Sequence, residues 1–300
     1  MLVTICHRTT YRYAKPVSLL PHRMMLCPRG QHDLRVLTTL LSCTPPAHLE
    51  WTQDVFGNLI ATATFNGEAD TLTIDSRMVV EQSATAWPIF DIAPSAHQFP
   101  FAYAPDELAD LGALRETQFP DAADHVRNWV AKFRVSEPTD TLTLLKAINT
   151  GILTEFAYRA RDEEGTQSPD ETIRSRSGSC RDFATLFIEA VRHLGFGARA
   201  VSGYLHETEA NALGFGGAHA STHAWAEVYL PCAGWIAFDP THDRMGGAGL
   251  IPVAVARTIE QIHPVQGRYT GAPGDFLDMV IDVSVITGTA LASAFDRPRS

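Results

Sequence analysis

One cysteine, one histidine and one aspartate of this chain have the types and the order of an activated nucleophile. Cys180 lies in the run SRSGSCRDFATLFIEAVRHLGFG, and His223 and Asp239 follow it in HAWAEVYLPCAGWIAFDPTH. A thiol that is deprotonated by an imidazole, which a carboxylate in turn orients, can attack a carbonyl carbon. The three residues therefore predict cysteine-dependent acyl transfer.

The helix expected after Cys180 sets the environment of its thiol. Residues 177–179 are of helix-capping type, the segment RDFATLFIEAVRHL has one apolar face, and Gly195 is a natural stop. Unpaired backbone amides and the positive end of the helix dipole favour a thiolate at this position. They also offer donors to a developing oxyanion, and the backbone amide of Cys180 is the first of these.

His223 and Asp239 fall on two expected strands, which the turn at residues 231–234 joins. Antiparallel pairing of HAWAEVYL with WIAFDPTH would bring both side chains toward the same end of the hairpin. The carboxylate can then hold one imidazole nitrogen as a donor while the other nitrogen faces the thiol. Taken singly, His223 is readily an ordinary strand histidine and Asp239 a turn former, so the prediction depends on all three residues together.

Two aromatic residues and one further carboxylate are weaker candidates near the predicted site. Tyr158 precedes the cysteine and is a candidate second oxyanion donor, with an ordinary core tyrosine as the alternative. Trp225 is expected to pack beside the imidazole and to line the pocket. Asp182 is expected either to accept amide hydrogen bonds in the first helical turn or to face solvent.

Two patterns of hydrophobicity divide the chain and predict an α+β fold. Residues 1–84 alternate and are rich in Thr, Val, Ile and Leu, which indicates an N-terminal antiparallel β-domain. Residues 85–105, rich in Pro and aromatics, are expected to be a linker. Residues 106–274 predict a catalytic core of helices packed on an antiparallel sheet. Residues 275–300 form a final strand and tail, and the strand is expected to return to the β-domain.

Within the predicted core the period of the apolar residues changes from helical to strand-like. Three helical patterns precede the cysteine, at residues 106–117, 121–133 and 140–156. After the helix that follows Cys180, strand patterns recur in ARAVSGYL, HAWAEVYL and WIAFDP. These elements would place an antiparallel sheet against a helical layer.

Composition narrows the class of protein. The 300 residues, of which 45% are hydrophobic, can bury a substantial core, and a formal charge of −10 with scattered Lys and Arg argues against nucleic-acid binding. Five cysteines without CxxC spacing argue against a disulfide framework or a zinc ribbon. The N-terminus lacks the features of a signal peptide and no window is a membrane-spanning candidate, so we expect a cytoplasmic protein without a membrane partner.

Three blocks of residues resemble the transglutaminase-like superfamily, in particular bacterial members described as candidate cysteine proteases. The blocks are SGSCRDFA at 177–184 with LG at 194–195 and AR at 198–199, HAWAEV at 223–228, and FDPT at 238–241. Residues 10–17, 28–29 and 54–58 are similar to the β region that precedes the core in that bacterial subgroup. The resemblance covers most of the chain and implies a papain-like α+β core.

This resemblance implies Cys180 as nucleophile, His223 as general base and acid, and Asp239 as the orienting carboxylate. The implied reaction is attack on a glutamine carboxamide or a peptide carbonyl, which gives a thioester that water or an amine resolves. A peptide or protein is the implied substrate. Animal transglutaminases of this fold use calcium, but the chain has no DxDxDG-type loop, so the resemblance implies no metal and no cofactor.

A zinc site is the alternative from a different chemical class. Its candidate ligands cluster in the sequence and are His206, His219, His223, Asp239 and His242. The segment that carries His219 and His223 indicates a loop that enters a strand, rather than a helix that would hold both residues on one face. Zinc is therefore the weaker of the two chemical hypotheses.

A second alternative is a protein that keeps this fold but only binds peptides or partner proteins. The sequence shows that the three residues are present, but it does not show that they meet. Residues 207–221, which are rich in Gly and Ala, are predicted to form a mobile loop that borders the cleft and controls access to it. The sequence gives no indication of the oligomeric state.

Overall fold

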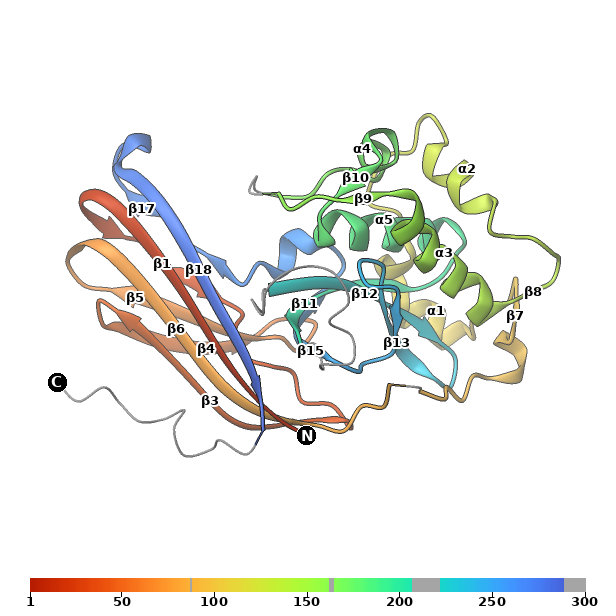
Figure 1. Cartoon of the computed structure of the whole chain (residues 1–300), viewed down its shortest axis with the longest axis horizontal. Coiled ribbons are helices and arrows are strands. Elements are labelled where there is room, and N and C mark those ends of the chain that lie inside the picture. Colours follow the sequence, from red (N-terminus) through yellow and green to blue (C-terminus); the bar gives the residue numbers. More distant parts are fainter. Residues whose placement is uncertain (87, 162–164, 207–221, 289–300) are drawn as a thin grey trace.

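The computed structural model of the chain describes residues 1–300 apart from 87, 162–164, 207–221 and 289–300. A β-sheet region and a region in which helices pack on a separate sheet lie at opposite ends of the molecule (Figure 1). The predicted α+β class, with an antiparallel β region first and helices packed on a sheet after it, is confirmed.

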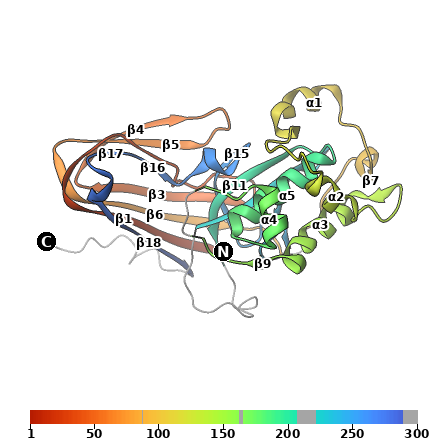
Figure 2. The same cartoon turned by 90° about the horizontal axis from the view of Figure 1, so that it is seen from above.

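The N-terminal region consists of two antiparallel sheets that form separate layers (Figure 2). The larger has the order β17-β1-β6-β3, with β18 also paired to β1, and its strands are β1 (Leu2–Leu19), β3 (Leu34–Thr44), β6 (Glu68–Gln82), β17 (Tyr269–Thr270) and β18 (Phe276–Thr287). The smaller has the order β16-β2-β5-β4, with β2 (His22–Met24), β4 (Ala47–Gln53), β5 (Leu59–Phe65) and β16 (Val265–Gln266). Tyr13, Leu72 and Ile74 of the larger sheet pack against Ala61 and Ala63 of the smaller, so the two layers share a core.

Strand pairing places the C-terminal strand in the N-terminal region. β18 pairs antiparallel with β1 from Val3↔Thr287 to Tyr13↔Phe276. The short strands β16 and β17 also pair with β2 and β1. These strands belong to the N-terminal sheets. The second region therefore ends earlier than residue 274, which is the boundary that the sequence predicts.

The second region is built on an antiparallel sheet of order β14-β13-β12-β11-β15. Its strands are β11 (Ala198–Leu205), β12 (Thr222–Leu230), β13 (Gly234–Asp239), β14 (Arg244–Met245) and β15 (Leu250–Ala256). The helices are α1 (Pro105–Leu111), α2 (His125–Ala131), α3 (Thr141–Glu155), α4 (Pro169–Ser175) and α5 (Cys180–His193). None of the helices in the described part of the chain is long and apolar enough to span a bilayer.

The central helix α5 packs on the sheet and contributes seven buried apolar residues to the core of this region. Phe183, Leu186, Phe187 and Ala190 are fully buried, and the ring of Phe187 stacks on Phe238 of β13. Short elements complete the region, namely η1 (Pro94–Ala96), β7 (Gln98–Phe99), η2 (Gly112–Arg115), β8 (Thr139–Asp140), β9 (Ala157–Tyr158), β10 (Ser177–Gly178), η4 (Ile259–Ile262) and η5 (Pro273–Asp275). The packing of α5 on the sheet fixes where the first residue of this helix lies relative to β12 and β13.

The segment at 85–105, expected to be a linker, contributes to the same core. Ile92, Ala96 and Phe99 are buried there, and Phe99 stacks on Phe196. The regions also meet directly, because Tyr204 and other residues of β11 and β15 pack on the first residues of β1. The second region is therefore held against the N-terminal sheets by a continuous apolar contact.

Candidate active site

Cys180 is the first residue of α5, as the capping residues of the sequence predict. The turn before it is held by Asp182, whose Oδ2 accepts hydrogen bonds of 2.8 Å from both the backbone nitrogen and the hydroxyl of Ser179. Gln167 N and Arg161 Nη1 donate to Oδ1 of the same carboxylate at 2.7 and 2.8 Å. Asp182 is fully buried, so the prediction of local amide bonds is confirmed and solvent exposure is excluded. These contacts fix the position of the helix start that carries the thiol.

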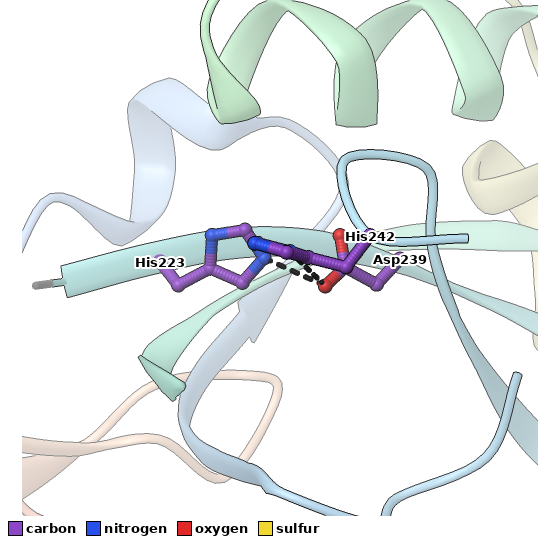
Figure 3. Close-up of side chains that lie close together, drawn as sticks. All are labelled: His223, Asp239 and His242. Carbon is purple, nitrogen blue, oxygen red and sulfur yellow. Dashed lines mark hydrogen bonds and ion pairs between the residues drawn. The ribbon is translucent and has the colours of Figure 1, made fainter. Parts of the chain in front are cut away.

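His223 on β12 and Asp239 at the end of β13 lie at the same end of the hairpin. The register sets Ala226 opposite Phe238, which brings the imidazole next to the carboxylate. His223 Nε2 lies 2.9 Å from Asp239 Oδ2 (Figure 3). Both side chains are buried, so this contact is shielded from water.

The thiol of Cys180 is hydrogen-bonded to the imidazole of His223. Since Nε2 of this ring is bound to Asp239, Nδ1 is the nitrogen left to face the sulfur. The structure thus brings the three residues of the predicted nucleophile together. Cys180 as a whole is partly exposed, whereas its thiol is largely enclosed by the surrounding groups.

Burial and charge act in opposite directions on the pKa of each of these groups. Burial raises the pKa of Cys180, but the hydrogen bond and charge of His223 and the backbone amide of Ala224 outweigh it, and the pKa lies below its ordinary value. Burial lowers the pKa of His223, but the charge and hydrogen bond of Asp239 outweigh it and raise the pKa to about 10. Burial raises the pKa of Asp239, but the charges and hydrogen bonds of His223 and His242 outweigh this effect and lower the pKa. Both shifts act in the direction of a thiolate beside an imidazolium.

His242 is a third imidazole at the site, which the sequence suggested only as a zinc ligand. Its Nδ1 lies 2.9 Å from Asp239 Oδ2, the oxygen that also binds His223 (Figure 3). Thr241 N donates to the other oxygen, Oδ1, at 3.0 Å. The sequence signal was the motif DPTH, because a side chain three residues beyond a turn-forming aspartate can fold back onto it. His242 therefore completes the set of donors around a fully buried carboxylate.

The cluster of His223, Asp239 and His242 contains three of the residues that the zinc hypothesis proposes as ligands. Ligand atoms of His223, Asp239 and His242 lie within 4.8 Å of one another, so these three could hold a metal ion. His206 is buried outside this cluster, and its ring nitrogens have no partner among the described residues. His219 and the predicted access loop at 207–221 lie outside the described residues. Three of the five proposed zinc ligands are thus brought together, and the hydrogen bonds to Asp239 already account for their positions.

The two aromatic candidates occupy different surroundings. Trp225 is buried, and its ring stacks on His223 with centroids 6.0 Å apart, as expected for a residue that packs beside the imidazole. Tyr158 is half exposed on β9, where its ring contacts the edge of Phe183 of α5. Burial raises the pKa of Tyr158, and the nearby charge of Cys180 raises it further, so the phenol stays protonated and able to donate. Its role as an oxyanion donor stays a prediction.

Comparison with known proteins agrees with the fold and with the resemblance of the sequence blocks. Residues 3–81 match the family model of the bacterial transglutaminase-like N-terminal region, and residues 117–240 match that of the transglutaminase-like superfamily. Residues 117–240 thus belong to the transglutaminase-like superfamily, and residues 3–81 to the bacterial transglutaminase-like N-terminal region. The family predicted from the residues around Cys180, His223 and Asp239 is therefore confirmed.

Three individual proteins are similar to this chain over most of their length. An uncharacterized protein of Mycobacterium tuberculosis is 29% identical over 304 residues, which cover 96% of this chain and 94% of that protein. One of Mycobacterium leprae is 24% identical over 282 residues and covers 93% and 97%. A crystal structure described as a "putative cysteine protease" from Cytophaga hutchinsonii superposes with a TM-score of 0.69 at 19% identity, and the match covers 96% of this chain and 92% of the other. At this identity the last comparison supports the fold alone.

Proposed function

We propose that this protein is a cysteine-dependent acyl-transfer enzyme of the transglutaminase-like type. The observation that carries the proposal is the thiol of Cys180, placed at a helix start and bonded to an imidazole whose other nitrogen is held by a buried carboxylate. Each part has a distinct task in nucleophilic catalysis. Cys180 attacks, His223 transfers protons, and Asp239 holds the ring and stabilises its charge.

In the acylation step the Cys180 thiolate forms a bond to the carbonyl carbon of a glutamine carboxamide or of a peptide. The carbonyl oxygen becomes an oxyanion beside the N-terminus of α5, where the backbone amide of Cys180 is the expected donor. The His223 imidazolium then gives its proton to the departing nitrogen, which leaves as ammonia or as an amine. The product of this step is a thioester on Cys180 and a neutral imidazole.

In the second step a nucleophile resolves the thioester. Neutral His223 accepts a proton from water or from an amine, which attacks the thioester carbonyl and releases the Cys180 thiolate. Water gives hydrolysis, whereas an amine gives transamidation. Both outcomes belong to the proposal, with a peptide or protein as the substrate, no nucleic-acid or membrane partner, and a cytoplasmic location that cell fractionation would test.

The experiment that tests the nucleophile is peptide-mapped alkylation of all five cysteines with iodoacetamide between about pH 5 and 9. Cys232 is exposed and serves as an accessible internal reference, while burial raises the pKa of Cys27 to about 11. We expect Cys180 alone to react at the acid end of this range, and His223→Ala to abolish that reaction. Equal reactivity of Cys180 and Cys232 would favour the binding-module alternative.

The reaction type needs a second experiment. A panel of glutamine-containing peptides, scored separately for ammonia release, amine incorporation and backbone cleavage, distinguishes the three outcomes. Cys180→Ser is the matched control, because it keeps the size and polarity of the side chain and removes the strong nucleophile. Turnover that survives Cys180→Ser would contradict the proposed mechanism.

The His223, Asp239 and His242 cluster favours zinc as a second candidate. Metal analysis of the purified protein before and after dialysis against a chelator tests it directly. Stoichiometric zinc, together with loss of activity on its removal, would replace the nucleophile mechanism. Unchanged Cys180 reactivity and turnover after dialysis would exclude a catalytic metal at this cluster.

A further inference from the structure

The C-terminal strand β18 is an edge strand that exposes almost its whole length. It pairs with β1 on one side, and no strand in the described part of the chain pairs with its other side. Figure 2 shows it at the border of one layer of the N-terminal region. Its sequence, FLDMVIDVSVIT, contains no proline and no lysine, the residues that proteins commonly use to block pairing at an open edge.

The pairing of β18 with β1 is regular from Asp278 to Thr287, with an irregularity only before Asp278. Alternation along this run puts Met279, Ile281, Val283 and Val285 on the face that points toward the interior. Val283 and Val285 pack against the apolar cluster at the contact with β11 and β15. Met279 and Ile281 lie outside this apolar cluster and are 47% and 45% exposed. An open edge and an uncovered apolar face therefore coincide on one stretch of strand.

The opposite edge of the same sheet lacks this combination. β3 carries an irregularity in its pairing between Val36 and Thr38, inside the strand. Its inward residues Leu41 and Cys43 pack against the cluster beneath the smaller sheet. The exposed apolar residue Leu40 therefore lies on a strand whose inward face is covered. Of these two edges, β18 is the one whose exposed apolar residues Met279 and Ile281 lie on the inward face, beside unpaired backbone groups.

We propose that β18 pairs antiparallel with β18 of a second copy of this chain, so that the two larger sheets join into one. A two-fold axis perpendicular to the sheet relates the copies, and residues that face one another then point to the same side. The axis must therefore pass at a residue that lies opposite itself. This requirement reduces the possible registers to a few.

The two aspartates of β18 select among these registers. An axis at Val280 sets Asp278 of one copy opposite Asp282 of the other. An axis at Asp282 sets the two Asp282 side chains opposite each other. In both registers like charges face one another and oppose pairing. An axis at Ile281 sets Asp278 opposite Ser284 and Asp282 opposite Val280. Asp278 is also neutralised within its own sheet by Arg12, at 3.2 Å. An axis at Ile281 avoids the repulsion.

An axis at Val283 would avoid it as well, but the face around Val283 and Val285 is already packed within one copy. With the axis at Ile281, Met279 of each copy lies opposite Val283 of the other, and the two Ile281 side chains meet. This register covers the apolar surface that each copy leaves exposed. It also satisfies the backbone groups of the free edge.

The oligomeric state of the full chain tests the proposal by analytical ultracentrifugation over a range of protein concentrations. We expect a dimer, and we expect Ile281→Lys, which puts a charge on the inward face, to weaken it at least about tenfold. Leu40→Lys is the matched control, since Leu40 is 52% exposed at the opposite edge and Ile281 45%. This control should leave the dimer intact.

Cysteine substitution tests the register in the same protein. Ile281→Cys should form a disulfide between copies under mild oxidation, because the two side chains meet at the axis, whereas Val280→Cys, which lies opposite Asp282, should not. The strand lies on the far side of the molecule from α5 (Figure 1), so low-pH labelling of Cys180 should be unchanged in Ile281→Lys and confirms its folding. A monomeric full chain, or a dimer that resists Ile281→Lys, would overturn the proposal.

Discussion

Two buried histidines, one in each region of the molecule, have pKa values shifted in opposite directions. His7 lies on β1 at the contact between the regions, with Nδ1 2.8 Å from the hydroxyl of Tyr204 and Nε2 3.1 Å from that of Thr9. Burial lowers the pKa of His7 to about 4. His223 is equally enclosed, but Asp239 outweighs the effect of burial and the pKa rises to about 10.

The difference shows that the charge of the partner, rather than burial, decides what a buried imidazole can do. Hydroxyl groups satisfy both nitrogens of His7 but offer no negative charge to balance a proton, so the ring stays neutral. Asp239 supplies that charge to His223 and makes an imidazolium stable without solvent. The first histidine joins two regions of the fold, and the second can hold and transfer a proton.

The largest effect is expected for Asp239→Asn, which keeps the shape of the side chain and removes the charge that distinguishes His223 from His7. His223 would then have a neutral partner as His7 does, and its pKa should fall below the ordinary value. Cys180 would lose its imidazolium, and we expect its alkylation rate near pH 6 to fall roughly 10³-fold. Quantitative peptide mapping of the alkylated protein measures this rate.

Asp243→Asn is the matched control for that substitution. Asp243 is a neighbouring carboxylate that binds Asn149, Thr150 and Lys146 instead of an imidazole. The control should leave Cys180 alkylation near pH 6 within a small factor of the unmodified protein. Equal losses in the two variants would show that the charge near Cys180 acts without a specific pair, against the assignment of Asp239.

A second test uses the dependence of stability on pH, where the two histidines act in opposite windows. The pKa of His7 is lower in the folded than in the unfolded chain, so its contribution is complete above pH 6.5 and is lost as pH falls toward 4. We expect this loss to reach about 3 kcal/mol. His7→Asn keeps a hydrogen-bonding atom near Nδ1 but does not titrate. The difference in unfolding free energy between the two proteins, measured with denaturant, should therefore change with pH only in this window.

For His223 the sign is reversed. Its raised pKa gives a contribution that is complete below pH 6.5 and is lost as pH rises toward 10. The lowered pKa of Cys180 acts in the opposite sense, since the thiolate gains stability above the point where it ionises. Cys180→Ala removes this offset, and an alkaline loss of stability steeper than in the unmodified protein is expected. An unchanged alkaline profile would show that the Cys180 thiol supplies no such offset in the folded chain.

Much of the fold follows from local sequence pattern, and the missed elements have identifiable causes. The alternation in ARAVSGYL predicts the bounds of β11, and Asp140, predicted to start a helix, caps α3 by accepting a hydrogen bond from Thr143 N. β15 was missed, because LIPVAVA is apolar on both faces and contains Pro252. A proline is tolerated there because β15 is the last strand of its sheet, which the sequence cannot show.

The candidate site was predictable in its residues but not in all of its contacts. The order of Cys180, His223 and Asp239, with the hairpin between the last two, indicated which residues form the site, but the sequence alone did not show that they meet. The contact of His242 with Asp239 depends on the turn that follows β13, in which Asp243 adopts a left-handed conformation with φ of 52°. Such a turn is set by packing around α3, including the bond from Asn149 to Asp243, and leaves no periodic signal in the sequence.

The smallest expected effect concerns His242, whose Nδ1 shares Asp239 Oδ2 with His223. We infer that it positions the carboxylate, so His242→Ala should slow Cys180 alkylation about tenfold, the cost of one hydrogen bond to a buried charge. His242→Asn places a donor near the Nδ1 position and should restore the rate, which a requirement for ring packing alone would not allow. If neither variant changes the rate, then Thr241 N and His223 suffice to hold Asp239, and the contrast with His7 depends on a single ion pair.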